Sequence, residues 1–406
     1  MGLPQFISGR ITREAAGFAA VIHRIAIISI GIGLGAMIIA FLIMNGFRNR
    51  IREKVYGFSG HILVNRITGS NSMEEPPFNY RISLYQHDPD TFPDIVHVQE
   101  FSHKAGLIKS GKDILGVMLK GVGRGFDRSR FSDNIKEGEF PSFPDSGYSS
   151  GIVISKAIAK KLSLKTGDNV IVHFFQNPPR ARKLQITGMY ETNLSDYFDE
   201  KVILCDNRLI QRLNDWSPDQ AGGLEIFIRN PDDAGRINQQ LMDHLPYDLF
   251  AEPTGSRYSQ VFEWLQLISR QVNILLVIIL AVVCVNMVSV ILILVMERTT
   301  MIGLLKALGA ADNSVRRIFF VQGVNLIVKG LLVGNLLGLG LCWLQYQFRI
   351  IRLDPANYYM DFVPVSWEWP TVLLLNFIVL ITVALVMVIP VAVISRIRPV
   401  SAIRFD

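Results

Sequence analysis

Uninterrupted apolar runs stand near both ends of the chain, and a stretch of mixed composition lies between them. The first run, Ile25–Met44, contains no charged residue. It is long enough to cross a bilayer, because a spanning helix needs about 20 apolar residues. Three further runs follow later in the chain: Ile274–Met296, a part of Ile318–Phe348, and Thr371–Ile394. We therefore predict a polytopic α-helical membrane protein with four transmembrane helices.

The first run is expected to be a retained span rather than a cleaved signal peptide. It is longer than the usual apolar part of such a peptide, and the residues after it, Asn45-Gly-Phe-Arg48, lack a small-x-small cleavage site. Gly31 and Gly35 within the run form a Gly-x-x-x-Gly face that allows another helix to approach closely.

Residues 48–257 form the stretch of mixed composition, and their patterns predict a large α+β extracytoplasmic domain inserted between helices 1 and 2. Ala105–Ser110 and Ile114–Gly121 are expected to pair as a hairpin around a Gly-Lys-Asp turn. Ser155 is placed to cap a helix that ends at Leu162, and Pro231 opens another helix. The other expected elements are strands over Asn169–Phe175, Lys183–Tyr190, Val202–Cys205 and Leu224–Ile228, a turn over Gln176–Arg180, and an amphipathic helix over Tyr258–Gln271.

The predicted hairpin turn imitates part of a phosphate-binding loop. Gly106 and Gly111-Lys112 have the required spacing, but Asp113 stands where a Ser or Thr would hold Mg²⁺, and no helix follows. A carboxylate at that position would also repel phosphate. The sequence therefore shows no ATP site in this chain.

A short helical segment, Glu297–Ala310, separates the second and third apolar runs and contains Gly309 near its end. Its apolar positions follow a helical spacing, which connecting loops rarely carry. We expect an exposed helix that offers Ile302, Leu305, Ala307 and Leu308 to a partner. An ordinary connecting loop is the alternative.

Basic residues border the apolar runs unevenly. They precede the first run, follow the second, and follow the fourth: Arg10, Arg13 and Arg24; Arg298, Lys306, Arg316 and Arg317; Arg396, Arg398 and Arg404. Because short cytoplasmic segments carry the excess of Lys and Arg, both termini and residues 297–317 are expected in the cytoplasm. Arg48, Arg50, Arg52 and Lys54 conflict with this orientation, but long domains translocate largely regardless of such charge. The expected divisions are 1–47, 48–257 and 258–406.

Polar residues and glycines inside the later runs predict helix packing. Asn286 is expected to form a hydrogen bond between helices rather than to bind substrate. Lys329 has two possible placements: its side chain is buried and functional, or it extends to the membrane surface by snorkelling. We favour snorkelling. Gly330, Gly334 and Gly338 form a stripe of small residues suited to close contact with a neighbouring helix.

Composition excludes several classes of function. The formal net charge is +6, but the basic residues cluster beside the apolar runs and no base-reading motif accompanies them. Cys205 is alone in the soluble part, so an intradomain disulfide is impossible there. The seven histidines form no metal-binding pair, no Gly-x-Ser-x-Gly is present, and no carboxylate lies within the spans. No catalytic residue and no metal site are expected.

The order of one span, a large domain and three spans resembles the ABC permeases typified by MacB and FtsX, and within them the lipoprotein-releasing permeases LolC and LolE. The resemblance covers nearly the full length and rests on several short motifs. These are Met44-Asn-Gly-Phe47, Gly57-Phe58 with His61-Ile62, Gly151-Ile-Val-Ile-Ser155, Leu164-Lys-Thr-Gly-Asp168, Ile302-Gly-Leu-Leu-Lys-Ala-Leu-Gly-Ala310, Val321-Gln-Gly323 and Arg398-Pro-Val-Ser-Ala-Ile-Arg404.

This resemblance implies an inner-membrane subunit that extracts lipoproteins and passes them to a periplasmic carrier. The implied partners are a cytoplasmic LolD-like ATPase, a second permease copy or homologue, a LolA-like carrier and a triacylated lipoprotein. ATP and Mg²⁺ would be bound by the ATPase, so no cofactor is expected in this chain. The implied sites are an ATPase-coupling helix (Thr300, Met301, Ile302, Gly303, Leu304, Leu305, Lys306, Ala307, Leu308), a lipid cavity (Met37, Phe41, Met44, Ile274, Val277, Ile278) and a carrier contact (Gln176, Asn177, Pro178, Pro179, Arg180).

Two departures from the family pattern matter. Met301 stands where the family commonly has an acidic residue, so one charged contact with the ATPase is missing and the contact should be mainly apolar. The turn over Gln176–Arg180 is short compared with the hairpin by which LolC holds the carrier. The six cavity residues have an alternative interpretation, because a helix surface that faces lipid or packs against another helix would have the same apolar sequence pattern. MacB-like efflux and FtsX-like control of wall hydrolases are the alternative functions.

Overall fold

The computed structural model describes residues 18–68, 74–86, 92–111, 113–194 and 198–392, and the chain separates into two compact units. The helical unit comprises residues 1–49, 264–352 and 362–406, and the sheet unit comprises residues 50–263 and 353–361. Among the described residues, the helical unit has one hydrophobic core and the sheet unit has two.

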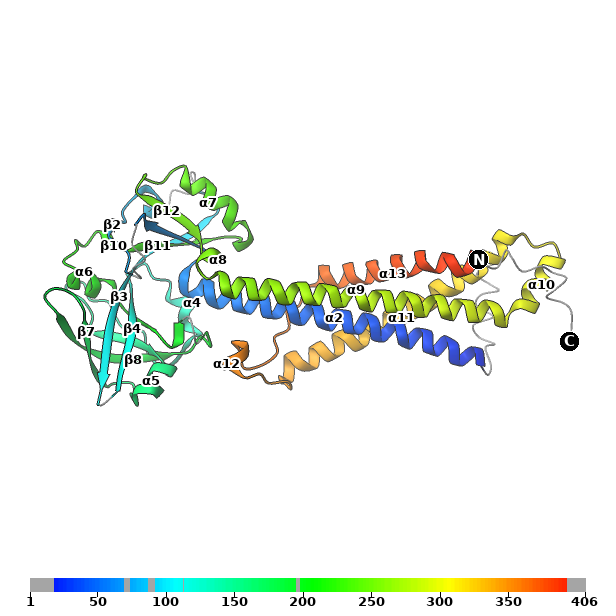
Figure 1. Ribbon diagram of the computed structural model, residues 1–406, viewed down its shortest axis with the longest axis horizontal. Coiled ribbons are helices and arrows are strands. Elements are labelled where there is room, and N and C mark those ends of the chain that lie inside the picture. Colours follow the sequence, from blue (N-terminus) through cyan, green and yellow to red (C-terminus); the bar gives the residue numbers. More distant parts are fainter. Residues whose placement is uncertain (1–17, 69–73, 87–91, 112, 195–197, 393–406) are drawn as a thin grey trace. The chain divides into compact units, whose positions relative to one another are not determined.

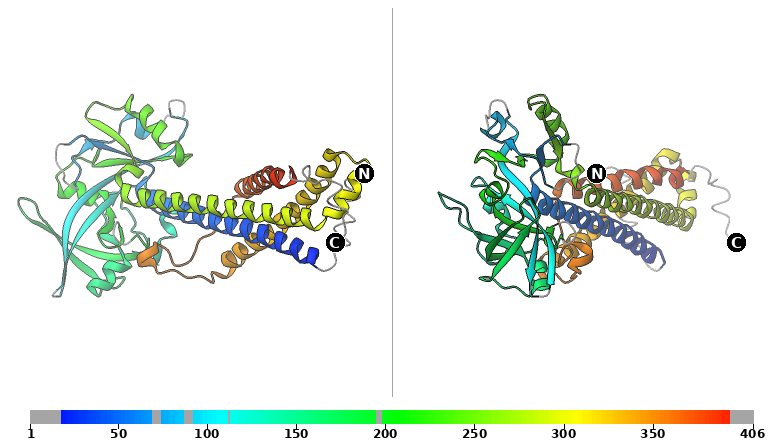
Figure 2. Two further views of the ribbon diagram at one scale, coloured as in Figure 1. Left: turned by 45° about the vertical axis from the view of Figure 1, so that its right-hand side comes forward. Right: turned by 60° about the vertical axis from the view of Figure 1, so that its left-hand side comes forward.

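The helical unit is built from α11 (Asp312–Phe348), α13 (Trp369–Ala392) and most of α2 (Phe18–Ser59) and α9 (Ser259–Glu297), with the short α10 (Thr299–Ala307) between α9 and α11. Residues 50–59 of α2 and 259–263 of α9 belong to the sheet unit. In the described part of the chain, these four long helices are long and apolar enough to cross a membrane. Figures 1 and 2 both show α2 and α9 running side by side. The contact is close because Gly33 of α2 has no side chain and faces Val283 and Ile279 of α9.

Two glycine stripes bring α2 and α11 together. A Cβ atom added to Gly334 would lie 2.8 Å from Cβ of Leu34 and 2.9 Å from the carbonyl oxygen of Gly31. A Cβ atom on Gly35 would lie 3.3 Å from the carbonyl oxygen of Gly334. Only small residues allow the two backbones to approach this far. The stripe on α2 and the stripe on α11 therefore face each other within one chain.

A polar pair and a further glycine join α11 to α13. Asn335 donates from Nδ2 to Oδ1 of Asn376 at 2.7 Å, and Asn376 donates back to Oδ1 of Asn335 at 3.0 Å. Nearer the start of α11, Gly323 leaves space for the side chain of Met387. The reciprocal amide bonds satisfy polar groups that the surrounding apolar side chains could not.

The strands of the sheet unit are β1 (Ile62–Arg66), β2 (Phe78–Asn79), β3 (Ile95–Ser110), β4 (Asp113–Val122), β5 (Ile135–Gly138), β6 (Gly151–Ser155), β7 (Asn169–Phe174), β8 (Arg180–Tyr190), β9 (Val202–Asp206), β10 (Gln220–Ala221), β11 (Gly223–Ile228) and β12 (Leu249–Pro253). Its helices include α3 (Ser83–Gln86), α4 (Arg128–Ser132), α5 (Lys156–Leu162), α6 (Asn207–Leu213), α7 (Ala234–Met242), α8 (Thr254–Arg257) and α12 (Pro355–Tyr358). The main sheet has the order β12-β1-β11-β3-β4-β9-β6-β8-β5, and β7 pairs with β3 and β8.

The long strand β3 links two cores. Its first half pairs with β11 and its second half with β4 and β7. One core lies around β1, β11, β12 and α7, and the other around β4, β6, β8, α5 and α6; Figure 1 shows α7 beside β12 and α5 beside β8. The sheet unit is therefore an α+β fold with two adjoining hydrophobic cores.

Several local predictions are confirmed. The hairpin pairs Ser110 with Asp113 and Ala105 with Met118. The Ser155 hydroxyl accepts a hydrogen bond from the backbone N–H of Ile158 at 3.0 Å, as an N-cap does. The expected strands near residues 169, 183, 202 and 224 are present, although β8 begins at Arg180 and β3 begins at Ile95. The start of β3 escaped the sequence pattern because Gln99 and Glu100 are buried within it.

Two element boundaries differ from the prediction. The helix of the first apolar run continues to Ser59, because Ile51, Val55 and Phe58 are buried at helical spacing after the apolar run has ended. The expected amphipathic helix over Tyr258–Gln271 is not separate, since α9 runs unbroken from Ser259 to Glu297. The described cysteines Cys205, Cys284 and Cys342 are all free and buried.

Candidate functional site

The segment between α9 and α11 folds as the helix α10, with defined ends. At its start the hydroxyl of Thr299 donates to the carbonyl of Met296 at 2.6 Å, where α9 gives way to α10. At its end Gly309 adopts a φ of +92°, which a glycine reaches without strain. The N–H of Ala310 then bonds to the carbonyl of Leu305 at 2.9 Å. A helix with both ends fixed is more than a connecting loop.

The burial of α10 corrects one expectation. Ile302 is fully buried in the core of the helical unit, and Gly303 beside it is buried as well. Ile302 is therefore not available to a partner. Its burial follows from helical spacing, because it points toward the side of α10 that packs on the rest of the bundle.

The exposed face of α10 lies at a different set of positions. Leu304 is 55% exposed and Leu308 is 78% exposed, and Thr300 and Ala307 are exposed as well. These four residues recur three or four positions apart and so share one side of the helix. We name this side, Thr300, Leu304, Ala307 and Leu308, the coupling face. Leu305 and Met301 are only partly exposed at its border.

An ion pair fixes the corner between α10 and α11. Nζ of Lys306 lies 3.0 Å from Oδ1 of Asp312, and the lysine side chain is only 8% exposed. Lysine at the end of one helix and aspartate at the start of the next both complement the helix dipoles. Lys306 is thus tied into the corner between the two helices.

The residues expected to line a lipid cavity do not share one surface. Met37 and Met44 are buried, Phe41 is partly buried, and Ile274, Val277 and Ile278 of α9 are exposed. Met37 belongs to the core of the helical unit, and it lies one turn after Gly33, the residue of α2 that faces α9. The exposed apolar stripe of α2 is formed instead by Val21, Ile25, Ile28 and Ile32.

The polar residues of the spans have different surroundings. Asn286 of α9 donates to the hydroxyl of Ser29 of α2 at 2.9 Å, so the expected interhelix hydrogen bond is confirmed. Lys329 is exposed on the outside of α11 in this chain. It is therefore not buried among the chain's own helices, which was the alternative to snorkelling.

The turn between β7 and β8 is held down at both ends. Arg180 is the first residue of β8, not part of the turn, and its Nη1 donates to the carbonyl of Leu213 at 2.8 Å. It also forms two bonds to Asp215, at 3.1 and 2.7 Å, and these bonds lower the pKa of the Asp215 carboxyl. Gln176 donates to the same Leu213 carbonyl at 2.9 Å. Asn177, Pro178 and Pro179 remain exposed between these anchors.

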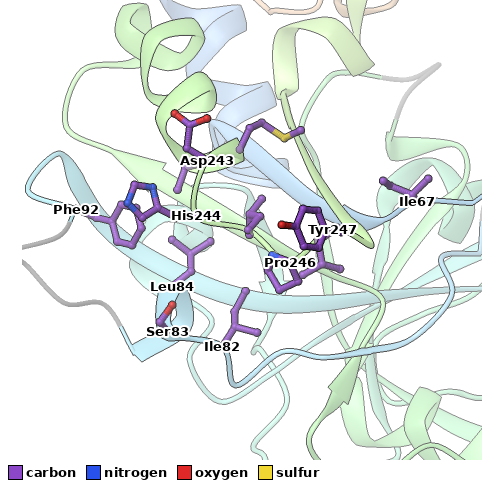
Figure 3. A pocket seen from close by; sticks show the side chains of 13 residues that line it. Ile67, Ile82, Ser83, Leu84, Phe92, Asp243, His244, Pro246 and Tyr247 are labelled. Atoms are coloured by element: carbon purple, nitrogen blue, oxygen red, sulfur yellow. The ribbon is translucent and has the colours of Figure 1, made fainter.

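A pocket of about 690 Å³ lies between α7 and the segment around Leu84. Figure 3 shows Phe92 and His244 together on one side of it and Tyr247 with Ile67 on the other. The rings of Phe92 and His244 meet edge to face with centroids 5.5 Å apart. The mixed lining suits an apolar group that carries a polar end. No sequence motif pointed to this pocket, because its residues come from separate segments.

A buried charged network surrounds the last turn of α2, within the sheet unit. Nζ of Lys120 on β4 lies 2.6 Å from Oε1 of Glu225 on β11, and both side chains are only 2% exposed. Lys120 also donates to the carbonyl of Phe58, in the last turn of α2, and lies 4.7 Å from the Phe58 ring centroid. Gln99 donates to the other oxygen of Glu225 at 2.7 Å. The network joins α2, β3, β4 and β11, and sequence reasoning missed it.

His61, just after α2, is kept neutral by its surroundings. Burial and the nearby Arg130 lower the pKa of its imidazole to about 4. Its Nδ1 accepts a hydrogen bond from the N–H of Ile228 at 2.9 Å, which requires an unprotonated nitrogen. Within the described residues, no group of three or more His, Cys, Asp or Glu side chains is placed to hold a metal ion.

Comparison with known proteins finds two matching family models. The MacB-like periplasmic core domain matches residues 25–243, more than half of the chain, and the FtsX-like permease C-terminal model matches residues 273–399. The chain is 24% identical over 393 residues to the lipoprotein-releasing system transmembrane protein LolE of Haemophilus influenzae, with 92% of each chain covered.

A second relative is the LolC protein of Xylella fastidiosa, 22% identical with 96% of this chain and 95% of that protein covered. Among solved structures, the periplasmic region of MacB from Actinobacillus actinomycetemcomitans aligns with a TM-score of 0.35 at 13% identity. This alignment covers 50% of this chain and 92% of that structure.

Proposed function

We propose, from the premise that this chain belongs to the family with the MacB-like periplasmic core domain, that it is a permease subunit of a lipoprotein-releasing ABC transporter. The observation that carries the proposal is the similarity to LolE and LolC over more than nine-tenths of each chain. A match of this extent includes the apolar helices, the sheet unit and the segment around α10 together.

The proposed task is to extract lipoproteins from the inner membrane and pass them to a LolA-like periplasmic carrier. Each acyl CH₂ group removed from the bilayer into water would cost about 0.8 kcal/mol, so a triacylated lipoprotein does not leave spontaneously. A non-catalytic permease can use ATP only through a partner. In this proposal a cytoplasmic LolD-like ATPase binds ATP and Mg²⁺, and a second permease copy or homologue completes the membrane part.

The coupling face of α10 is the proposed contact with the ATPase. It offers two exposed leucines, Leu304 and Leu308, and Thr300 and Ala307 leave room beside them. Met301 supports a mainly apolar contact with the ATPase, because it occupies the position at which the family commonly has an acidic residue. Movement of α10 would reach the bundle through buried Ile302 and through the Lys306–Asp312 pair.

The unbroken helix α9 supports a mechanical role. It runs without a break from Ser259 to Glu297, next to α10 in the chain, and so offers one continuous helix on which a displacement of α10 would act. At the other end Tyr258 shares a hydrogen bond of 3.1 Å with Ser59, the last residue of α2. In the proposed orientation both termini and α10 are cytoplasmic and the sheet unit is periplasmic.

A pair of aspartate substitutions tests the coupling face. Leu304→Asp should weaken binding of the ATPase about tenfold or more, because burying a leucine contributes roughly 1.5–3 kcal/mol. The control is Ile114→Asp, which places the same charge at an exposed apolar position of the sheet unit. Ile302→Asp should lower the thermal stability instead, because it buries a charge. Wild-type ATPase binding by Leu304→Asp would refute the assignment.

Depletion of the protein in cells tests the transport function itself. Outer-membrane lipoproteins should then accumulate in the inner membrane. Normal lipoprotein sorting combined with altered drug export would favour MacB-like efflux, and normal sorting combined with a wall-hydrolysis defect would favour FtsX-like regulation.

A further inference from the structure

A second pocket, of about 260 Å³, opens between α11 and α13. Two arginines of α11, Arg316 and Arg317, form its polar side, and Phe320, Val388, Val391 and Ala392 form its apolar side. The pocket is separate from the coupling face and from every residue proposed above to bind a lipoprotein or a carrier. It therefore needs an explanation of its own.

Among the described residues, the two arginines have no hydrogen-bond or ion-pair partner. The buried Nε of Arg316 likewise has no acceptor within this part of the chain. An unpaired buried N–H costs about 1–3 kcal/mol, and a charged one costs more. Arginine presents its donors in a fixed fork that matches phosphate oxygens. The polar side of the pocket therefore presents unpaired N–H donors that the oxygens of an oxyanion would satisfy.

The depth of the pocket along α13 identifies where that oxyanion would lie. Trp369 opens α13, and its ring stacks on Trp367 with centroids 6.1 Å apart, as part of an exposed aromatic group that marks a membrane boundary. From Trp369 to Val388 the helix rises about 28 Å, close to the roughly 30 Å hydrocarbon thickness of a bilayer. The pocket therefore lies at the opposite boundary, at the level of lipid headgroups.

The apolar side of the pocket selects among phosphate compounds. Val388 is 51% exposed and continues the outward apolar surface of α13 that includes Leu385 and Ile389. A free phosphate would leave this surface uncovered, whereas the first acyl carbons of a lipid would cover it. We propose that the pocket binds an anionic phospholipid, with Arg316 and Arg317 on the phosphate and the acyl chain along Phe320 and Val388.

Native mass spectrometry of the full-length protein in detergent tests this site, with phosphatidylglycerol and phosphatidylcholine added at equal concentration. The wild type should retain phosphatidylglycerol preferentially. The double variant Arg316→Gln/Arg317→Gln should retain about tenfold less, since it loses charge-assisted hydrogen bonds. Arg349→Gln, which removes an arginine just after the other end of α11, should retain as much as the wild type.

A second variant and two competitors separate the alternatives. Ala392→Trp fills the pocket while both arginines remain, and it should lower lipid retention to a similar degree. Glycerol 3-phosphate should not displace the lipid, because it lacks acyl chains. Equal loss in Arg349→Gln, unchanged retention in Ala392→Trp, or displacement by glycerol 3-phosphate would each overturn the proposal. So would loss of ATPase binding in the double variant with lipid retention unchanged, since the arginines would then serve a protein contact.

Discussion

Replacement of Lys120 by methionine is expected to destabilise the contact between the last turn of α2 and the strands β4 and β11 of the sheet unit, which we call the junction. Methionine keeps most of the volume of the lysine side chain but none of its charge. The variant loses the ion pair with Glu225 and the hydrogen bond to the Phe58 carbonyl. Glu225 keeps one bond, from Gln99, and is otherwise left as a buried charge.

The expected loss is about 3–5 kcal/mol, the range found when one partner of a buried ion pair is removed. The double variant Lys120→Met/Glu225→Gln should recover part of this loss, because it leaves no uncompensated charge and the amide can still accept from Gln99. Lys161→Met serves as a control, since its ion pair with Glu200 is 3.1 Å long but nearly half exposed. Exposed pairs contribute only about 0–1 kcal/mol.

Hydrogen exchange of the full-length protein in nanodiscs measures these losses locally. Protected amides of β4 and β11 should exchange roughly two to four orders of magnitude faster in Lys120→Met, since about 1.4 kcal/mol corresponds to a factor of ten. Exchange in Lys161→Met should change by less than about tenfold. If Lys120→Met behaved like Lys161→Met, the network would not stabilise the junction and the reasoning would be wrong.

Two further predictions concern pH and packing. The pKa of His61 falls from its ordinary 6.5 to about 4 on folding, so the folded state binds fewer protons than the unfolded state between these values. The stability contributed by neutral His61 is present above pH 6.5 and is lost as the pH falls, by up to about 3 kcal/mol near pH 4. Chemical denaturation at several pH values should therefore show that the free energy of unfolding depends less on acid pH in His61→Gln than in the wild type. An identical pH dependence in the two proteins would contradict the assignment. Gly334→Ala should destabilise the helical unit by roughly 1–3 kcal/mol, because the added methyl group would meet both a side chain and a carbonyl of α2. Gly340→Ala on the same helix has open space and should not lower the melting temperature in nanodiscs; equal effects of the two variants would show that α2 and α11 do not pack through Gly334.

Elements that depend on neighbouring residues were accessible from the sequence. The apolar runs predict helices long enough to span a membrane because the bilayer demands a fixed length of apolar residues. Ser155 predicts a helix start, and the Gly-Lys-Asp turn predicts a hairpin, because caps and turns are set by a few adjacent residues. The family resemblance drew on the same short motifs.

The boundaries were less accessible where burial and polarity disagree. The continuation of α2 to Ser59 carries arginines and a lysine between its buried residues, and so loses the appearance of a span. The first half of β3 contains buried Gln99 and Glu100, which interrupt the expected alternation. In both cases a polar residue was accommodated by a partner from a distant segment, and no local pattern reports such a partner.

The sequence alone determined that the chain has membrane-spanning runs, an α+β part and a helical segment between two spans. Only the tertiary structure decided which side of each helix is covered. A span is apolar all round, so its sequence cannot show that Met37 is buried, and the pattern of α10 cannot show that Ile302 lies in the core while Leu304 stays exposed. Burial depends on which neighbour covers a face, and that neighbour comes from a distant part of the chain.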